Sequence, residues 1–542
     1  MVTTPVGRAD DQTPVGRADD RTAVSRSARP ASRSDVAARP GPFVSTTVAI
    51  LVAATCIPLG YVVWGAVSVG WTRAYELVVR PRVGELLFNT VALVAITVPL
   101  CVVIGVAVAW LVERTDLPGR TFWRPLFVAP LAVPAFVNSY AWVGVIPSLH
   151  GLWAGVLITT LSYFPFMYLP VAATLRRLDP AVEESARALG SDSTGVFFRI
   201  VLPQLRLAIL GGSLLIGVHL LAEFGAFAMV RFNTFTVAIF QQFQVTFDGA
   251  AGSMLAGVLV LLCLVLLIAE ATARGRARYA RVGAGAPRTA VRVHLGGKAF
   301  PATVGLIALA LLSIAVPVWT IVRWLWIGGA EVWDVGAITN ALVQTVGLAS
   351  AAAVLTTVLA FPVAWVAVRS HGAPARMVEG ANYITSALPG IVTALALVTV
   401  AIHFVRPLYQ SVPLIVFAYV LLFMPRALVN VRAGLAQVPP GLEEASRSLG
   451  ISPSATFFRV TLRLTAPAAA AAASLVFVAV ATELTATLLL APTGTRTLSM
   501  LFWSFSSELD YAAAAPYALA LVVLAIPVTL ILFRQSTKVA AL

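Results

Sequence analysis

Long apolar runs separated by short polar segments make up most of the sequence. A membrane-spanning helix needs about 20 mostly apolar residues. Twelve runs are long enough, at 44–67, 87–112, 123–146, 152–174, 208–230, 252–270, 300–327, 341–368, 378–404, 410–431, 467–490 and 513–534. Their continuous rather than alternating pattern excludes a β-barrel. Kinks are expected at the prolines inside several runs, namely Pro99, Pro130, Pro134, Pro362 and Pro389. The pattern predicts an all-α polytopic membrane protein with about 12 transmembrane helices.

The composition narrows the class further. Of the 542 residues, 59% are hydrophobic and 11% are charged, whereas a soluble domain is about a quarter charged. So few charges cannot cover a water-facing surface, which excludes a soluble enzyme. Cys56, Cys101 and Cys263 all lie in apolar runs. They are too few for a disulfide framework or a thiolate metal site, and we expect them to be small core residues.

The basic residues indicate orientation. From Arg274 to Lys298 the chain carries six Arg and one Lys and no acidic residue, which is half of the net charge of +14. In a membrane protein such a segment marks the cytoplasmic side, and we expect contact with the lipid bilayer rather than with nucleic acid. The polar tail at 1–42 carries seven more Arg and predicts a disordered cytoplasmic segment. Six spans on each side of the basic segment place the N- and C-termini in the cytoplasm.

The two sets of six spans share a pattern. Residues recur first 255 and then 260 positions later, in the pairs Trp110 and Trp365, Arg114 and Arg369, Pro134 and Pro389, Pro165 and Pro425, Gly190 and Gly450, and Glu223 and Glu483. Because each set has an even number of spans, the sequence predicts two parallel six-helix repeats with a pathway between them. The predicted domains are the tail (1–42), a first six-span domain (43–270), a basic cytoplasmic linker (271–298) and a second six-span domain (299–542).

The longest polar interruption of each half lies between its fourth and fifth spans, at 176–206 and 432–464. Each begins with a Pro-containing turn and a short amphipathic helix, which Gly190 or Gly450 is expected to end. A second helix with a Ser-containing N-cap then carries a Phe-Phe-Arg triplet. The segment predicts a helix–glycine–helix unit on the cytoplasmic face. Arg114 and Arg369 follow matched tryptophans and are expected to be snorkelling anchors.

This segment resembles the signature of the membrane subunits of binding-protein-dependent ABC importers: Glu-Ala-Ala, three residues, Gly, nine residues, Ile-x-Leu-Pro. The first copy has Glu184, Ser185, Ala186, Gly190, Ile200, Leu202 and Pro203. The second has Glu444, Ala445, Ser446, Gly450, Val460 and Leu462, with Arg463 in place of the proline.

The resemblance implies the type I importer fold, in the plasma membrane, with each unit acting as a coupling helix for a cytoplasmic ATPase. This chain has no GxxxxGK[ST] phosphate loop, so we expect it to be a transport subunit and not an enzyme. ATP and Mg²⁺ would bind to two copies of a separate ATPase subunit, and no cofactor to this chain. An extracytoplasmic binding protein would deliver the solute.

Fused two-half permeases of this kind look most like the iron(III) importer group, and thiamine and aminoalkylphosphonate permeases share the layout. The segments 222–243 and 481–502 carry the likeness to the iron(III) group, and both contain a glutamate, Glu223 or Glu483. His219 lies one helical turn before Glu223. An ionisable residue within a span is a candidate functional residue, and a hard trivalent cation favours carboxylate oxygens. The alternative is that both glutamates brace re-entrant backbone or Arg side chains such as Arg231.

Two other classes fit the pattern less well. A 12-span secondary transporter also has two parallel halves, and residues 113–120 faintly resemble its acidic–basic loop, but the counterpart at 369–376 lacks the acid. A membrane-embedded enzyme would need a cluster of His, Asp or Cys, and the five His residues are scattered.

Overall fold

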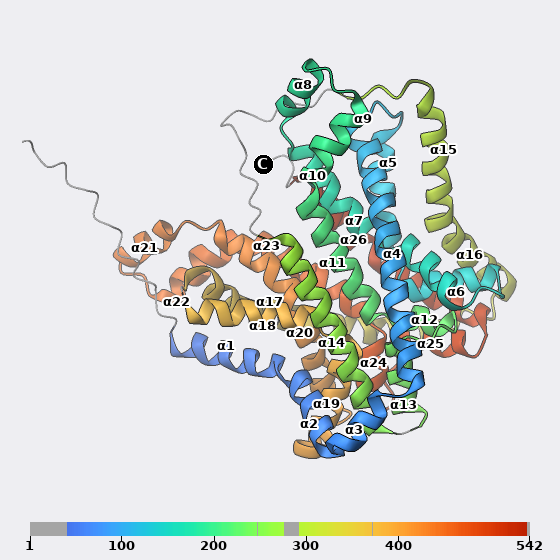
Figure 1. The fold of residues 1–542 in the computed structure, drawn as a ribbon. Helices are drawn as coiled ribbons and strands as arrows, with labels where there is room; N and C mark the ends of the chain where they lie inside the picture. The colour runs from blue at the N-terminus through green and yellow to red at the C-terminus, as the bar shows by residue number, and fades with distance from the viewer. Residues whose placement is uncertain (1–40, 247, 276–291, 371, 539–542) are drawn as a thin grey trace, which may run out of the picture. The chain divides into compact units, whose positions relative to one another are not determined.

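The computed structural model describes residues 41–246, 248–275, 292–370 and 372–538 (Figure 1). Within these ranges the chain is helical apart from turns and one bridge between Thr115 and Val293. Residues 1–40 of the predicted disordered tail (1–42) and most of the predicted basic linker lie outside the described residues, and α1 already begins at Pro42. The all-helical architecture confirms the predicted fold class.

The first half contains α1 (Pro42–Thr55), α2 (Ile57–Val69), α3 (Trp71–Val78), α4 (Pro81–Arg114), α5 (Arg120–Leu126), α6 (Ala135–Val145), α7 (Gly151–Arg177), α8 (Pro180–Ala188), α9 (Ser193–Val196), α10 (Leu202–Gln204), α11 (Arg206–Ala222), α12 (Gly225–Met229), α13 (Phe235–Gln244) and α14 (Gly249–Arg274). The second half contains α15 (Ala299–Ala310), α16 (Val316–Gly328), α17 (Val335–Arg369), α18 (Ala373–Ala387), α19 (Gly390–Phe404), α20 (Val412–Ala436), α21 (Pro440–Ser448), α22 (Pro453–Thr456), α23 (Leu462–Ala481), α24 (Thr485–Leu490), α25 (Leu498–Ser507) and α26 (Tyr511–Lys538).

Eight of the described helices are long and apolar enough to span a membrane alone, and four bent pairs bring the total to as many as 12. The third span of each half is strongly bent, by 91° in the first half and 104° in the second. The bends fall at Pro134 and Pro389, because proline lacks the N–H that would continue the helix and pushes the preceding residue into an extended conformation. Pro99 and Pro362, in contrast, lie inside the continuous helices α4 and α17.

The two halves interlock through their first spans. In each half the second and fourth spans pack together, α4 on α7 and α17 on α20. The first span crosses over, so that α2 packs on α19 of the second half and α16 packs on α6 of the first. Gly144 of α6 permits this approach, because an added Cβ would lie 3.0 Å from the Trp324 ring nitrogen. Each half is therefore held partly by a helix that belongs to the other.

The fifth span of each half is broken where a continuous helix was expected. Helix α11 ends at Ala222 and α23 at Ala481, and the short helices α12 and α24 begin after Glu223 and Glu483. The predicted spans 208–230 and 467–490 are therefore wrong as continuous helices. The two breaks meet, since an added Cβ on Gly225 would lie 2.9 Å from Leu484 of the other half. Apolar runs do not reveal such breaks, because the broken segments stay hydrophobic on both sides.

The cysteines agree with the core prediction at two positions of three. Cys101 and Cys263 are buried, whereas Cys56 lies exposed at the joint between α1 and α2. Cys56 forms the C-cap of α1, and Pro58 is the second residue of α2.

Candidate functional site: coupling units and paired glutamates

Both predicted helix–glycine–helix units are present and nearly identical. Gly190 and Gly450 follow α8 and α21 with φ of +87° and +77°, a conformation that favours glycine. The second helix starts at a side-chain cap, Asp192 accepting from the Gly195 N–H and Ser452 from the Ala455 N–H. Each Phe-Phe-Arg triplet then forms a π-helical turn, at Phe197–Val201 and Phe457–Thr461. Figure 1 shows α8 and α21 well apart from one another.

Buried ion pairs join each unit to the second span of its half. Arg114 Nη2 lies 2.9 Å from Glu183 Oε1, with both side chains at most 6% exposed. The matched pair is Arg369 and Glu443, at 3.2 Å. The interpretation of Arg114 and Arg369 as snorkelling anchors is therefore wrong, because both guanidinium groups turn inward to a carboxylate of the coupling unit. The sequence signal was available: each Arg and each Glu recurs in the second half.

The predicted motif residues divide between the surface and the interior of the unit. Glu184, Ser185, Glu444 and Ala445 are exposed. Ser446 is buried and its hydroxyl lies 2.9 Å from that of Thr456 in the following helix, while Ala186 is half-buried at the matched position. The carboxylates that anchor the units are therefore Glu183 and Glu443, one residue before those that the motif singles out.

Apolar side chains project from both units. The apolar patch of each unit consists of three matched residues, Val182, Leu189 and Phe198 in the first half and Leu442, Leu449 and Phe458 in the second, each between 47% and 87% exposed. Exposed apolar groups beside the exposed Glu184 and Glu444 are typical of a protein-docking surface.

The two glutamates in the broken spans hold the re-entrant segments. The Glu223 carboxylate accepts from the Ala226 N–H at 3.0 Å and from the Tyr163 hydroxyl at 2.7 Å. The Glu483 carboxylate accepts from the N–H groups of Ala486 and Thr487, both at 2.9 Å. Each side chain thus satisfies amides at the start of a short helix, which otherwise lack partners.

The same carboxylates also remain accessible. Glu223 and Glu483 are half-buried rather than buried. Bracing of the backbone and access to a pathway are therefore compatible in geometry. The brace acts on backbone amides rather than on Arg231. A role of Glu223, His219 and Glu483 in the pathway stays a prediction.

Arg426 of α20 is a charged residue that the sequence interpretation missed. Its Nη2 lies 3.3 Å from His219 Nε2, so it joins the second half to the first. The signal was an arginine well inside the predicted span 410–431, at the position that Phe166 occupies in the first half. A charge at that depth is a candidate functional residue by itself.

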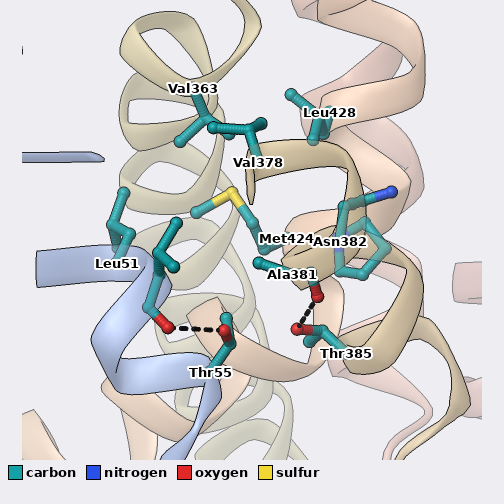
Figure 2. A pocket seen from close by; sticks show the side chains of 11 residues that line it. Leu51, Thr55, Val363, Val378, Ala381, Asn382, Thr385, Met424 and Leu428 are labelled. Atoms are coloured by element: carbon teal, nitrogen blue, oxygen red, sulfur yellow. Dashed lines mark hydrogen bonds between the residues drawn. The ribbon is translucent and has the colours of Figure 1, made fainter. Parts of the chain in front are cut away.

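A small pocket lies elsewhere, between α1 of the first half and α17, α18 and α20 of the second (Figure 2). It is lined mainly by apolar side chains such as Leu51, Val378 and Met424. Figure 2 shows its hydroxyls bonded locally, Thr55 to the Val52 carbonyl and Thr385 to the Ala381 carbonyl. The pocket includes none of the predicted site residues.

Comparison with known proteins agrees with the duplicated geometry. The model of the family "Binding-protein-dependent transport system inner membrane component" matches twice, at residues 66–273 and 357–540. The Fe(3+)-transport system permease protein FbpB 2 of Haemophilus influenzae is 36% identical over 495 residues, which covers 90% of this chain and 98% of that protein. The sulfate transport system permease protein CysW of Synechocystis is 31% identical over 33% of this chain and 72% of its own length. CysT of Escherichia coli, also a sulfate permease, is 27% identical over 41% of this chain and 87% of its own length.

These matches exclude the secondary-transporter and membrane-enzyme alternatives, because the family model covers most of both halves. The chain therefore belongs to the family of inner-membrane components of binding-protein-dependent transport systems and carries the domain of that family twice.

Proposed function

We propose that this chain forms the membrane pathway of an ATP-driven importer of ferric iron. The observation that carries the substrate is the relative of Haemophilus influenzae, which is named for Fe(3+) transport and matches along 98% of its length. The sulfate permeases match only about the length of one half. The fused two-half layout thus favours iron over sulfate, and the match along nearly the whole length of the Fe(3+) permease favours iron over the thiamine and aminoalkylphosphonate alternatives, which share that layout.

The partners follow from the coupling units. One cytoplasmic ATPase subunit docks on each apolar patch, so a single chain binds two copies. ATP and Mg²⁺ bind to those subunits, and an extracytoplasmic binding protein delivers the solute on the opposite face. Both termini of this chain lie in the cytoplasm. The similarly high exposure of Leu189 (87%) and Leu449 (78%) supports two equivalent docking sites.

In the transport cycle, the coupling helices α8 and α21 act as rigid levers on the two membrane halves. The ion pairs of Glu183 with Arg114 and of Glu443 with Arg369 fasten each coupling helix to the cytoplasmic end of α4 or α17. Closure of the two ATPases then draws α8 and α21 together and rotates the halves about the meeting point of the broken spans. Glu223 and Glu483 lie at that point, where the pathway changes its access from one face to the other.

Uptake of radiolabelled ferric ion tests the substrate. A strain that lacks its own ferric importer receives this chain together with its ATPase and binding protein. We expect ATP-dependent accumulation of ⁵⁵Fe. Rescue of thiamine or phosphonate growth without ⁵⁵Fe uptake would refute the iron assignment.

Docking is tested by replacing the exposed leucines of both units. We expect the double variant Leu189→Ser and Leu449→Ser to lose binding of the ATPase subunit, measured by co-purification, while the permease stays folded. The matched control is Val412→Ser, which replaces a 53% exposed apolar residue at the N-terminal end of α20, opposite the end that leads into the second coupling unit. Equal ATPase binding by all three proteins would refute docking at these patches.

A further inference from the structure

The contact between Arg426 and His219 is a positively charged point within the interface of the two halves. Arg426 lies 14 residues after the start of α20, at about 21 Å along a helix that is 25 residues long. His219 lies on α11, one turn before Glu223. The guanidinium is therefore near the middle of the membrane, and its partner His219 lies one helical turn before Glu223.

The hydrogen bonds of His219 fix its charge state. Nδ1 lies 2.8 Å from the Leu215 carbonyl, and a carbonyl only accepts, so Nδ1 carries the proton. Nε2 faces the Arg426 guanidinium at 3.3 Å and must accept. The imidazole is neutral in this arrangement, and Arg426 supplies the charge of the pair.

The guanidinium has neighbours that do not neutralise it. Its carbon lies 5.2 Å from the centre of the Phe423 ring, and His219 takes one of its five N–H donors. Among the described residues, no carboxylate lies within 4.0 Å of Arg426, whereas the neighbouring Arg432 pairs with Glu379 at 2.8 Å. Arg426 is also exposed. A planar fork with free donors is suited to a bidentate oxyanion.

The fold does not require this charge. Phe166 of the first half corresponds to Arg426, and Ala479 of the second half corresponds to His219. Phe166 instead packs on the His219 ring, with centroids 4.7 Å apart. The two halves are thus asymmetric here: both have a glutamate in the broken span, but only the second half has an arginine at this position of its fourth span.

We propose that Arg426 and His219 form a binding site for a small oxyanion, and that the ferric ion crosses together with this anionic ligand. A bare trivalent cation on its way to Glu223 and Glu483 would be repelled by Arg426. A ferric ion that carries an oxyanion presents a positive side to the glutamates and a negative side to the guanidinium. The inference rests on the proposed iron import, and it deepens that proposal by adding the second component of the cargo.

Direct binding is tested with inorganic phosphate as the probe and without iron. The purified permease is heated with and without phosphate, and its unfolding temperature is measured. Phosphate should raise the unfolding temperature of the unmodified chain, because a ligand that binds only the folded state stabilises it. Arg426→Gln should abolish the shift and Arg426→Lys should reduce it. Arg432→Gln, which removes an arginine from the same helix, is the matched control. An equal shift in the Arg426→Gln and unmodified proteins overturns the site.

Co-transport is tested in proteoliposomes that contain the complete importer, with ⁵⁵Fe and ³²P-phosphate supplied together in the presence of the binding protein. We expect both labels to accumulate, and Arg426→Gln to lower both by about tenfold or more, as the loss of a hydrogen bond to a charged group does. ATPase activity stimulated by the binding protein verifies that the variant is assembled. Entry of ⁵⁵Fe without ³²P in the unmodified importer, or unchanged uptake by Arg426→Gln, overturns the inference while iron import stands. Absence of ⁵⁵Fe uptake by the unmodified importer refutes the proposed function itself.

Discussion

Replacing Glu183 by Gln isolates the ion pair that fastens the first coupling helix. Both side chains of the pair are nearly fully buried, with exposures of 4% for Arg114 and 6% for Glu183. Removing one partner leaves a buried charge without its counter-charge, which costs about 3 kcal/mol or more. Arg187, whose guanidinium lies 3.9 Å from Glu183, does not reduce this cost. It is positively charged itself and cannot neutralise Arg114. We therefore expect the α8 unit to open more readily from the end of α4, while the spans remain intact.

Hydrogen exchange measures this opening directly. A cost of about 3 kcal/mol corresponds to roughly a hundredfold faster exchange of the amides in α8 and the following turn, if they open as a local unit. Glu184→Gln is the control, because Glu184 carries the same charge on the same helix but is exposed. The double variant Arg114→Met and Glu183→Leu should restore protection, because two apolar groups leave no unpaired charge.

The result that refutes this reasoning is equal exchange in the Glu183→Gln and Glu184→Gln proteins. ATP hydrolysis that stays coupled to transport in Glu183→Gln would separately refute the lever. The second half provides an internal comparison. Arg369 also donates to the Val438 carbonyl at 2.9 Å, and Glu443 also accepts from the Thr461 hydroxyl. Glu443→Gln should therefore increase exchange of α21 less than Glu183→Gln increases exchange of α8.

Three further changes have defined outcomes. Gly105→Ala places a Cβ 2.6 Å from that of Met167 and 3.0 Å from the Tyr168 backbone nitrogen. We therefore expect the free energy of unfolding to fall by about 1–3 kcal/mol and the unfolding temperature to fall with it. Gly84→Ala, in open space on the same helix, is the control. Gly190→Ala meets no atom within 4 Å but must adopt a φ of +87°, so it should lower the free energy of opening of α8 by about 1 kcal/mol, measured by hydrogen exchange. A bulky residue at both Gly190 and Gly450 should abolish transport by blocking docking of the ATPase subunits. The Leu295 N–H and the His294 ring lower the pKa of the Asp116 carboxyl. The carboxylate therefore stabilises the docked position of residues 292–298 at pH values above its ordinary pKa, and this contribution is lost as the pH falls through the lowered pKa. Hydrogen exchange at 292–298, corrected for intrinsic rates, should rise on acidification in the unmodified chain and show less pH dependence in Asp116→Asn.

The spans could be predicted from the sequence because the bilayer requires a long apolar run for each crossing, and that requirement is local. The duplication could be predicted because the motif residues recur at fixed offsets. The breaks at Glu223 and Glu483 could not, because they depend on amides that meet a carboxylate only after the segment folds back. Nor could the crossing of α2 and α16 to the opposite halves, because all apolar faces are alike to a hydropathy pattern.

The candidate site shows the same division. The helix–glycine–helix shape is local, since positive φ and capping side chains are encoded within a few residues. The partner of Arg114 lies 69 positions away at Glu183 and is set by tertiary packing. Family resemblance directed attention to Glu184 and Glu444, which lie on the surface, whereas the residues that bear the mechanical connection precede them by one position. Two charges that recur together in both halves were a better indicator of contact than the motif itself.

The two halves share a scaffold but differ in their charges, and the differences lie at distinct levels of the molecule. The first half alone has Glu113, whose carboxylate accepts from Arg124 at 2.6 Å and Arg176 at 2.8 Å and ties the second, third and fourth spans together; the corresponding residue in the second half is Val368. The second half alone has Arg426. If the halves moved as equal partners, such differences would be unnecessary. A stiffer first half with a second half that carries the unmatched charge fits a mechanism in which α20 moves relative to α11, opening and closing the contact between Arg426 and His219. Glu113→Gln should then weaken the contacts among the second, third and fourth spans of the first half without altering phosphate binding at Arg426. That result would separate the stiffness of the first half from the recognition of the oxyanion.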